Sequence, residues 1–378
     1  MTKADKEGQR KAPILRFKGF TDDWEQRKLG KVIERRTQKR EFSDLPYIEY
    51  ADIIPNIGRL NKDIFSRKNT KQGIYFQKND ILFGKLRPYL NNWLKPQFEG
   101  IAVGDFWILN GIKLNNDFLY YYIQTKKFSD VANVTTGTKM PRSDWNLVSN
   151  LKIKFPNFEE QQNIGKLFYS LENLITLYEM KKQLLTQLKQ GIVNFLITKN
   201  GQKPQLRFSG FNNNWESKSF EKLLNYEQPT KYIVKKADYI SQGTPVLTAN
   251  KSFILGYTNE TNVYQNIPAI IFDDFTLESK YVDFPFMVKS SAIKILTSKN
   301  SNLFFIYQLL NNQKFVQEGH SRHYISVVQK KKVLVPSIQE QNKIGNLIKQ
   351  LKNSIEQNSD IIALLKSLKE FLLQNMFL

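Results

Sequence analysis

The sequence contains no cysteine and only two histidines, His320 and His323, in 378 residues. Without cysteine the chain can form neither a disulfide framework nor a thiolate metal site. No apolar run approaches the ~18 residues that a membrane-spanning helix needs. The N-terminal stretch MTKADKEGQRKA also lacks the apolar core of a signal peptide. We therefore expect a cytoplasmic protein whose residues 1–12 form a mobile basic tail.

Acidic residues are few relative to basic ones. The chain has 35 Asp and Glu against 56 Lys and Arg, which gives a formal net charge of +21 at pH 7. A surplus of this size indicates a polyanionic partner, most often nucleic acid, although a generically basic protein is the alternative.

Signatures of catalysis are also missing from the sequence. The Gly-Lys pairs at 30–31, 84–85 and 165–166 are followed by Val or Leu rather than Ser or Thr, so none forms a phosphate-binding loop. No glycine-rich turn suits a nucleotide or methyl-donor cofactor, and no Asn-Pro-Pro-aromatic segment of the kind used on a flipped base is present. The acidic run Asp273, Asp274 and Glu278 beside Lys280 loosely resembles a nuclease cluster, but its acids lie too close together in sequence. We expect no catalytic residue and no metal site in this chain.

The sequence does contain two repeated segments. Residues 155–197 match residues 335–377 at an offset of 180 without a gap, and the motif Pro-x-x-x-Glu-Gln-x-x-Ile-Gly starts at Pro156 and again at Pro336. Residues 13–25, PILRFKGFTDDWE, recur as PQLRFSGFNNNWE at residues 204–216. Each half of the chain is therefore a fixed leader, a variable body and a fixed C-terminal segment.

Both copies of the longer repeat are predicted to be long helices. Apolar residues recur at alternating three- and four-residue steps, which is the pattern of a coiled-coil seam. In the first copy the predicted seam is Ile164, Leu167, Leu171, Leu174, Tyr178, Leu185, Leu188, Ile192 and Phe195, with Lys181 as the one break; in the second it is Ile344, Leu347, Leu351, Ile361, Leu365, Leu368 and Leu372. We expect the two helices to pair with each other, and the alternative is that each packs on its own domain.

The bodies between these segments read as short strands cut by turn residues, with one helix in each, at 117–133 and 302–319. We predict an α+β fold of two mixed, β-rich domains and two long helices, related as an internal repeat. The predicted divisions are a tail at 1–12, a first domain at 13–157, a helix at 158–198, a linker at 199–203, a second domain at 204–337 and a helix at 338–378.

Several residues in the two bodies are candidates for DNA contacts. Basic residues alternate out of the apolar segment DILFGKLRPYL, and donor-rich loops stand at the same place in each body, at 137–145 and 319–324. Asp273 and Asp274 are either turn residues or acceptors for the exocyclic amines of bases. The candidates are Lys85, Arg87, Tyr89, Lys139, Arg142, Ser143, Lys251, Thr258, Asn259, Asp273, Asp274, His320, Arg322, His323 and Tyr324. Metal binding by the two histidines would need more donors than their loop offers.

The order of leader, body and helix, repeated once, resembles the specificity subunit of Type I restriction–modification enzymes. The resemblance covers nearly the whole chain, and its sharpest parts are the LRFxGFxxxWE leaders at 15–25 and 206–216 and the two Glu-Gln-x-x-Ile-Gly motifs. DILFGKLRPYL at 80–90 also looks like a segment of such target-recognition domains.

This resemblance implies two target-recognition domains, each reading one half of a bipartite, asymmetric site in double-stranded DNA. It also implies that the long helices pair antiparallel as a spacer between the half-sites. The implied partners are two methyltransferase subunits, which use S-adenosylmethionine, and restriction subunits, which use ATP and Mg²⁺; this chain itself would bind no cofactor. The rival interpretations are a stand-alone DNA-binding or adaptor protein and a nuclease with an unrecognised active site.

Overall fold

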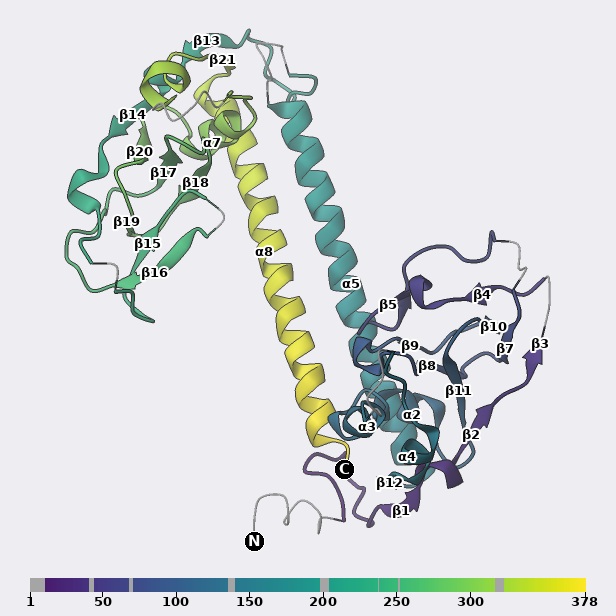
Figure 1. The fold of residues 1–378 in the computed structure, drawn as a ribbon. Helices are drawn as coiled ribbons and strands as arrows, with labels where there is room; N and C mark the ends of the chain where they lie inside the picture. The colour runs from purple at the N-terminus through teal and green to yellow at the C-terminus, as the bar shows by residue number, and fades with distance from the viewer. Residues whose placement is uncertain are drawn as a thin grey trace. The chain divides into compact units, whose positions relative to one another are not determined.

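The computed structural model describes residues 11–40, 44–67, 71–134, 140–197, 204–236, 238–250, 252–316 and 323–378. The chain divides into two compact units, each described here by itself (Figure 1). Unit 1 comprises Met1–Tyr178 and Asp360–Leu378, and unit 2 comprises Glu179–Ser359. No helix among the described residues combines the length and apolar character needed to cross a membrane.

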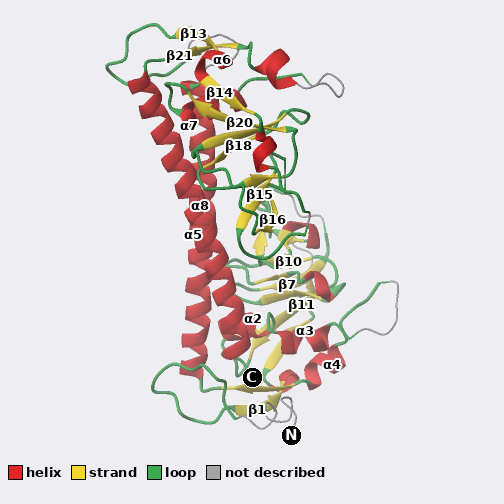
Figure 2. Ribbon diagram, turned by 90° about the vertical axis from the view of Figure 1, so that its left-hand side faces the viewer, coloured by secondary structure: helices red, strands yellow, loops and turns green. Residues whose placement is uncertain are grey.

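Both units combine short strands with short helices (Figure 2). In unit 1 these are β1 (Glu25–Lys28), β2 (Ile33–Arg36), β3 (Lys39–Arg40), β4 (Tyr47–Ile48), β5 (Ile53–Ile54), β6 (Arg59–Leu60), β7 (Gly73–Phe76), β8 (Ile81–Gly84), β9 (Trp93–Leu94), β10 (Gly100–Ala102), β11 (Phe106–Gly111), α2 (Asn116–Tyr122), α3 (Lys126–Ala132), α4 (Trp145–Asn150) and β12 (Lys152–Phe155). In unit 2 they are β13 (Glu216–Ser219), α6 (Phe220–Leu223), β14 (Leu224–Glu227), β15 (Thr244–Leu247), β16 (Ile254–Thr258), β17 (Ala269–Asp273), β18 (Ser279–Val282), β19 (Met287–Val288), β20 (Ile293–Ser298), α7 (Leu303–Asn311) and β21 (Lys332–Val335). The long helices are α5 (Phe158–Leu196) and α8 (Ile338–Asn375).

One four-stranded sheet has the same strand order in both units. Sheet β2-β11-β8-β9 in unit 1 corresponds to sheet β14-β20-β17-β18 in unit 2. Phe106 pairs with Gly84 at the end of β8, and Ile293 pairs with Asp273 at the same place in β17. The predicted repeat of two mixed, β-rich domains is therefore confirmed.

Each of these sheets separates two apolar cores, because successive side chains of a strand point to opposite faces. In β8, Ile81 and Phe83 belong to a core shared with α2 and α3, whereas Leu82 belongs to a core shared with the second sheet, β3-β7-β10-β4. In β17 the side chain of Phe272 likewise belongs to one core and that of Ile271 to the other. Burial on both faces explains why these strands read as continuous apolar runs.

The helix predicted at 117–133 is two helices in the structure. The first ends at Tyr122, and Thr125 caps the second, since its hydroxyl accepts a hydrogen bond from the N–H of Phe128. Threonine is a favoured helix N-cap, so the break lies where the sequence has a capping residue.

The residues shared by the two repeats hold each leader to the start of a long helix. Arg16 of the first leader donates two hydrogen bonds, of 2.9 and 2.7 Å, to the buried carboxylate of Glu160. Arg207 pairs with Glu340 in the same bidentate way, at 3.0 and 2.7 Å. β1 also pairs with β12, and β13 with β21, so the strand that begins at the last residue of each leader forms a two-stranded sheet with the strand before the long helix.

The glutamine of each Glu-Gln-x-x-Ile-Gly motif also makes defined hydrogen bonds. In unit 1 the Gln161 side chain accepts a hydrogen bond from the N–H of Asn115, the residue that caps α2, and donates one to the carbonyl oxygen of Pro156. In unit 2, Gln341 makes the same pair of contacts with Asn302 and Pro336. Both motifs therefore orient a long helix against a short one.

The long helices pair antiparallel within each unit. In unit 1 the start of α5 packs beside the end of α8, where Phe168 contacts Phe377 at a centroid distance of 5.7 Å. In unit 2 the end of α5, including Leu196, shares a core with Ile344 and Ile348 at the start of α8. The predicted pairing of the two helices is confirmed.

The predicted register of the seam is wrong at alternate positions. Leu174, Leu188 and Phe195 are 39%, 51% and 44% exposed, whereas Ile175 and Leu196, one residue further on, are buried. The apolar residues of α5 form two adjacent stripes, and spacing alone cannot say which of them faces the partner helix.

The contacts between the helices differ in charge between the units. In unit 1, Glu172 and Lys369 form an ion pair of 2.6 Å, and Glu172 also accepts a hydrogen bond from the hydroxyl of Tyr121. The repeat offset places Lys352 and Lys189 at these positions in unit 2. Burial and the charge of Lys352 lower the pKa of Lys189 below its usual value.

Candidate nucleic-acid interface

Two of the predicted DNA-contacting segments meet at one end of β8 in unit 1. The N–H of Arg87 donates to the carbonyl oxygen of Pro141 at 2.8 Å, and the N–H of Ser143 donates to the carbonyl oxygen of Lys85, also at 2.8 Å. These bonds bring Arg142 beside the turn that follows β8. Four sequence-predicted residues therefore lie within one small region.

Asp105, immediately before β11, fixes the cations of this region. Its carboxylate lies 2.9 Å from Nε of Arg142 and 3.4 Å from Nζ of Lys85. The Tyr50 hydroxyl donates to the carbonyl oxygen of Asp105 at 2.5 Å and accepts a hydrogen bond from the N–H of Leu86. Burial raises the pKa of Tyr50 far above its ordinary value, which keeps the hydroxyl protonated as the donor.

The side chains of the turn divide into exposed and buried ones. Arg87 and Tyr89 are exposed, Tyr89 by 56%, and Leu90 beside them is 40% exposed. Ser143 is buried, and its hydroxyl donates to the carbonyl oxygen of Ala132 at 2.7 Å. Ser143 therefore holds the loop in place, while Arg87 and Tyr89 are available to a ligand.

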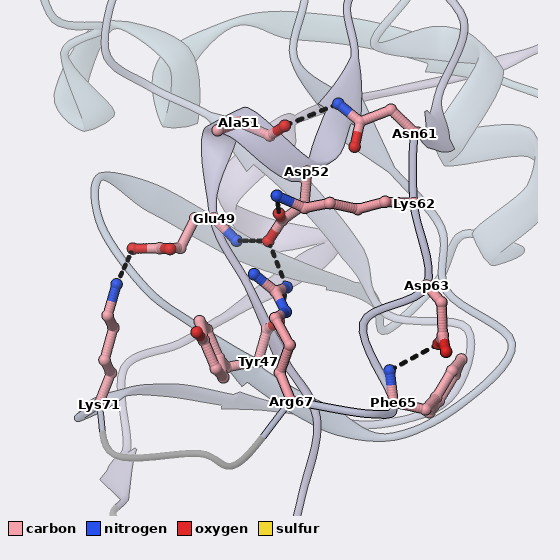
Figure 3. A network of polar contacts seen from close by, with 10 residues as sticks. All are labelled: Tyr47, Glu49, Ala51, Asp52, Asn61, Lys62, Asp63, Phe65, Arg67 and Lys71. Atoms are coloured by element: carbon pink, nitrogen blue, oxygen red, sulfur yellow. Dashed lines mark hydrogen bonds and ion pairs between the residues drawn. The ribbon is translucent and has the colours of Figure 1, made fainter.

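A buried carboxylate anchors the segment that supports this turn (Figure 3). Asp52 lies 2.9 Å from Nζ of Lys62 and 2.8 Å from an Nη atom of Arg67, and it accepts a hydrogen bond from the N–H of Glu49. Burial by itself raises the pKa of Asp52, but the hydrogen bonds from Arg67 and Lys62 outweigh it, so the pKa lies below its usual value. The sequence indicated none of these contacts.

The corresponding residues of unit 2 lie inside the domain. Asp274, 1% exposed, forms a 3.3 Å ion pair with Lys294 and accepts a hydrogen bond from the N–H of Tyr324. His323 is also buried, with Nδ1 3.2 Å from the carbonyl oxygen of Asp274, and Tyr324 is fully buried. The carboxylate of Asp273 accepts hydrogen bonds from the backbone of its own turn. The structure brings these four candidates together, although the sequence analysis treated them as two separate segments, and their side chains are buried in the domain.

The remaining candidates lie elsewhere. Thr258, at the end of β16, is buried and accepts a hydrogen bond from the N–H of Glu260 at 3.2 Å, whereas Asn259 is exposed. The last four candidates, Lys139, Lys251, His320 and Arg322, lie outside the described residues. Over the part of the chain that the structure describes, no group of three or more His, Asp or Glu side chains is arranged to hold a metal ion.

The sequence did not single out Asp105 or Lys294, although these residues form the ion pairs of the two regions. Asp105 is a lone acid in the apolar stretch AVGDFWIL, and Lys294 is a lone cation in the strand AIKIL. A single charge inside an apolar strand, or directly beside one, is the available signal, because a charge that is withdrawn from solvent there needs a partner.

Comparison with known proteins gives a consistent family. The model of the "Type I restriction modification DNA specificity domain" family matches residues 21–190 and 212–367. The EcoR124I/EcoR124II specificity subunit of Escherichia coli is 50% identical over 123 residues, 30% of this chain and 30% of that protein. The MjaVIII specificity subunit of Methanocaldococcus jannaschii is 24% identical over 213 residues, 50% of this chain and 48% of that protein. The matched stretches thus span less than half of the length of either relative.

A solved structure supports the fold. The S subunit of a Type I restriction–modification system from M. genitalium superposes with a TM-score of 0.66 at 15% identity, over 97% of this chain and 99% of that one. At this identity the likeness concerns the fold alone. Because the family model matches most of the sequence in two copies, the chain belongs to the Type I restriction modification DNA specificity domain family.

Proposed function

We propose that this chain is the DNA-recognition subunit of a Type I restriction–modification enzyme and has no catalytic activity of its own. Residues 13–157 and 204–337 act as target-recognition domains, and each reads one half of a bipartite, asymmetric site. The chain recruits two methyltransferase subunits, which use S-adenosylmethionine, and restriction subunits, which use ATP and Mg²⁺. The long helices set the spacing between the half-sites.

The observation that carries this proposal is a repeated framework with unlike contents. The two units share the strand order of one four-stranded sheet and the ion pairs at the starts of α5 and α8. They differ at the end of β8 and β17, where unit 1 has solvent-accessible cations around Asp105 and unit 2 has a buried Lys294–Asp274 pair. A shared scaffold with different surfaces suits two readers of different sequences. The net charge of +21 supports a DNA ligand.

Recruitment of partners is supported by exposed leucines at repeated positions. Leu184 and Leu188 of α5, in unit 2, are 66% and 51% exposed; Leu364 and Leu368 of α8, in unit 1, are 70% and 42% exposed. These pairs correspond at the repeat offset of 180. Large apolar side chains one helical turn apart suit an apolar helix of a partner, and two equivalent pairs suit two methyltransferase subunits.

The test is selection of bound duplexes from a random-sequence library by the full chain with its methyltransferase partner. We expect two short specified blocks separated by an unspecified spacer of fixed length. Selection of a single continuous block, or of no preferred sequence at all, would contradict the proposal. A salt series on the selected duplex should show the steep loss of affinity that phosphate contacts produce.

A further inference from the structure

We propose that Arg87 reads a guanine base in the half-site bound by unit 1, with Asp105 as the residue that positions its neighbours. The inference rests on the proposed function and specifies one contact within it. The site is the turn from Lys85 to Asn91, which follows β8.

The backbone of Arg87 is held in an uncommon conformation. Its φ and ψ are 48° and 60°, in the left-handed region, and Asn91 at the other end of the turn has φ 54° and ψ 48°. Side chains other than glycine rarely adopt this region, and arginine gains no local hydrogen bond there as asparagine does. Strain of this kind occurs at sites where a side chain must be presented in one direction.

The turn is tied down on both sides. Pro88 is buried and starts a short 3-10 helix, Pro88–Leu90, and the N–H of Leu90 donates to the carbonyl oxygen of Arg87 at 2.9 Å. The side-chain amide of Asn91 donates a hydrogen bond to the side-chain oxygen of Asn56 at 2.7 Å. The backbone N–H of Asn56 in turn donates to the carbonyl oxygen of Asn91 at 3.1 Å. A side chain on such a support loses little freedom on binding, which favours specific contacts.

Arg87 differs from its cationic neighbours in having no partner among the described residues. Asp105 holds the charges of Lys85 and Arg142, whereas no ion pair or hydrogen bond joins the guanidinium of Arg87 to any other described side chain. No described residue uses its five N–H donors, and the side chain is exposed. Lys85 and Arg142 remain half exposed beside it and suit the flanking phosphates, which they would contact as a fixed pair.

The chemistry that fits a rigidly presented, unpaired arginine is the O6 and N7 edge of guanine in the major groove. The planar guanidinium donates two parallel hydrogen bonds to these acceptors, and no other base offers the same pair. The equivalent turn in unit 2, DFTLES at 274–279, contains no Lys or Arg and exposes Phe275, Thr276 and Glu278. The guanine contact is therefore expected in only one of the two half-sites.

The experiment compares the full chain with Arg87→Gly, Arg87→Lys and Arg27→Ala by selection from a random duplex library. Glycine removes the side chain and fits the left-handed backbone, so the turn is preserved. Lysine keeps the charge but lacks the planar fork. Arg27 is an exposed arginine of β1 whose guanidinium pairs with Glu25, and it serves as the matched control.

We expect the unchanged chain and Arg27→Ala to select the same two half-sites. Arg87→Gly and Arg87→Lys should lose the preference for guanine at one position of one half-site, a loss of roughly 5- to 150-fold in discrimination. If the unchanged chain selects two half-sites and both Arg87 variants select them unaltered, the inference is overturned and the proposed function stands. If Arg87→Gly weakens binding to all sequences equally, Arg87 is a phosphate contact and the inference is again overturned. Failure of the unchanged chain to select any sequence would instead refute the proposed function.

Discussion

Removing Arg16 should strongly destabilise unit 1. Its guanidinium makes two hydrogen bonds to Glu160 and a third, of 2.8 Å, to the carbonyl oxygen of Asp22. The side chains of Arg16 and Glu160 are 13% and 0% exposed, so little solvent screens the pair. Arg16→Ala leaves a buried carboxylate without its partner, which costs about 3–5 kcal/mol.

The loss of stability can be measured as a fall in the thermal unfolding midpoint of unit 1. For a unit of about 200 residues, each 1 kcal/mol lowers the midpoint by roughly 2–4 °C, so we expect a fall on the order of 10 °C. Calorimetry with hydrogen exchange at pH 7 assigns the change, because amides of unit 1 should lose protection while those of unit 2 keep theirs. Arg207→Ala is the matched variant and should affect unit 2 instead, by less, since the Arg207 side chain is 25% exposed.

A double variant separates the loss of the pair from the loss of packing. Replacing both Arg16 and Glu160 with methionine removes the buried charge together with its partner, and such replacements are often close to neutral. The double variant should therefore recover most of the stability lost in Arg16→Ala. A loss below about 1 kcal/mol in Arg16→Ala, or equal loss of protection in both units, would show that the pair does not hold the leader.

Four further predictions test other parts of the structure. Lys352→Gln should raise the pKa of Lys189 toward its usual value, because it removes the repulsion from Lys352 and frees Glu356 from its 3.5 Å ion pair with that lysine; an NMR titration of the lysine side chains checks the direction against the unchanged chain. Because the folded protein lowers the pKa of Asp52, the carboxylate contributes fully to stability above its ordinary pKa of 3.8, and this contribution is lost as pH falls through the lower pKa of the folded state. Asp52→Asn should therefore be less stable than the unchanged chain at pH 7, and its free energy of unfolding should depend less on pH below about 4. Leu188→Glu and Leu368→Glu should each remove one methyltransferase subunit from the complex, counted by native mass spectrometry, without weakening DNA binding. Inserting four residues, roughly one helical turn, in the middle of α5 should change the unread spacer selected from a library, and changed half-sites with an unchanged spacer would contradict the role of the helices.

The architecture could be predicted from the sequence because it is repeated. Matching segments at fixed offsets indicated two similar domains and two long helices, and periodicity identified the helices. The register of the helical seam could not be predicted, because α5 carries apolar residues on two adjacent stripes. Leu174 and Ile175 are both good seam residues by type, and only the position of the partner helix decides that Ile175 is buried.

The candidate site was predictable only in part, because burial depends on contacts distant in sequence. Arg87 and Asp274 follow equivalent strands and both looked suitable for DNA. Lys294 of β20 pairs with Asp274 and keeps its carboxylate inside unit 2, whereas no described residue does so for Arg87. Charge type and spacing identify candidates, but the partner of each charge becomes known only from the fold.

Unit 2 lies between two stretches of chain that together make unit 1, and this affects the order of synthesis. Met376 and Phe377 belong to the same core as Phe118 and Phe168, although more than 200 residues separate them in sequence. On the ribosome, residues 1–178 must therefore wait with an incomplete core until all of unit 2 has been made. Unit 2, being continuous, can fold first, so the nascent first domain is the one exposed to chaperones and proteases.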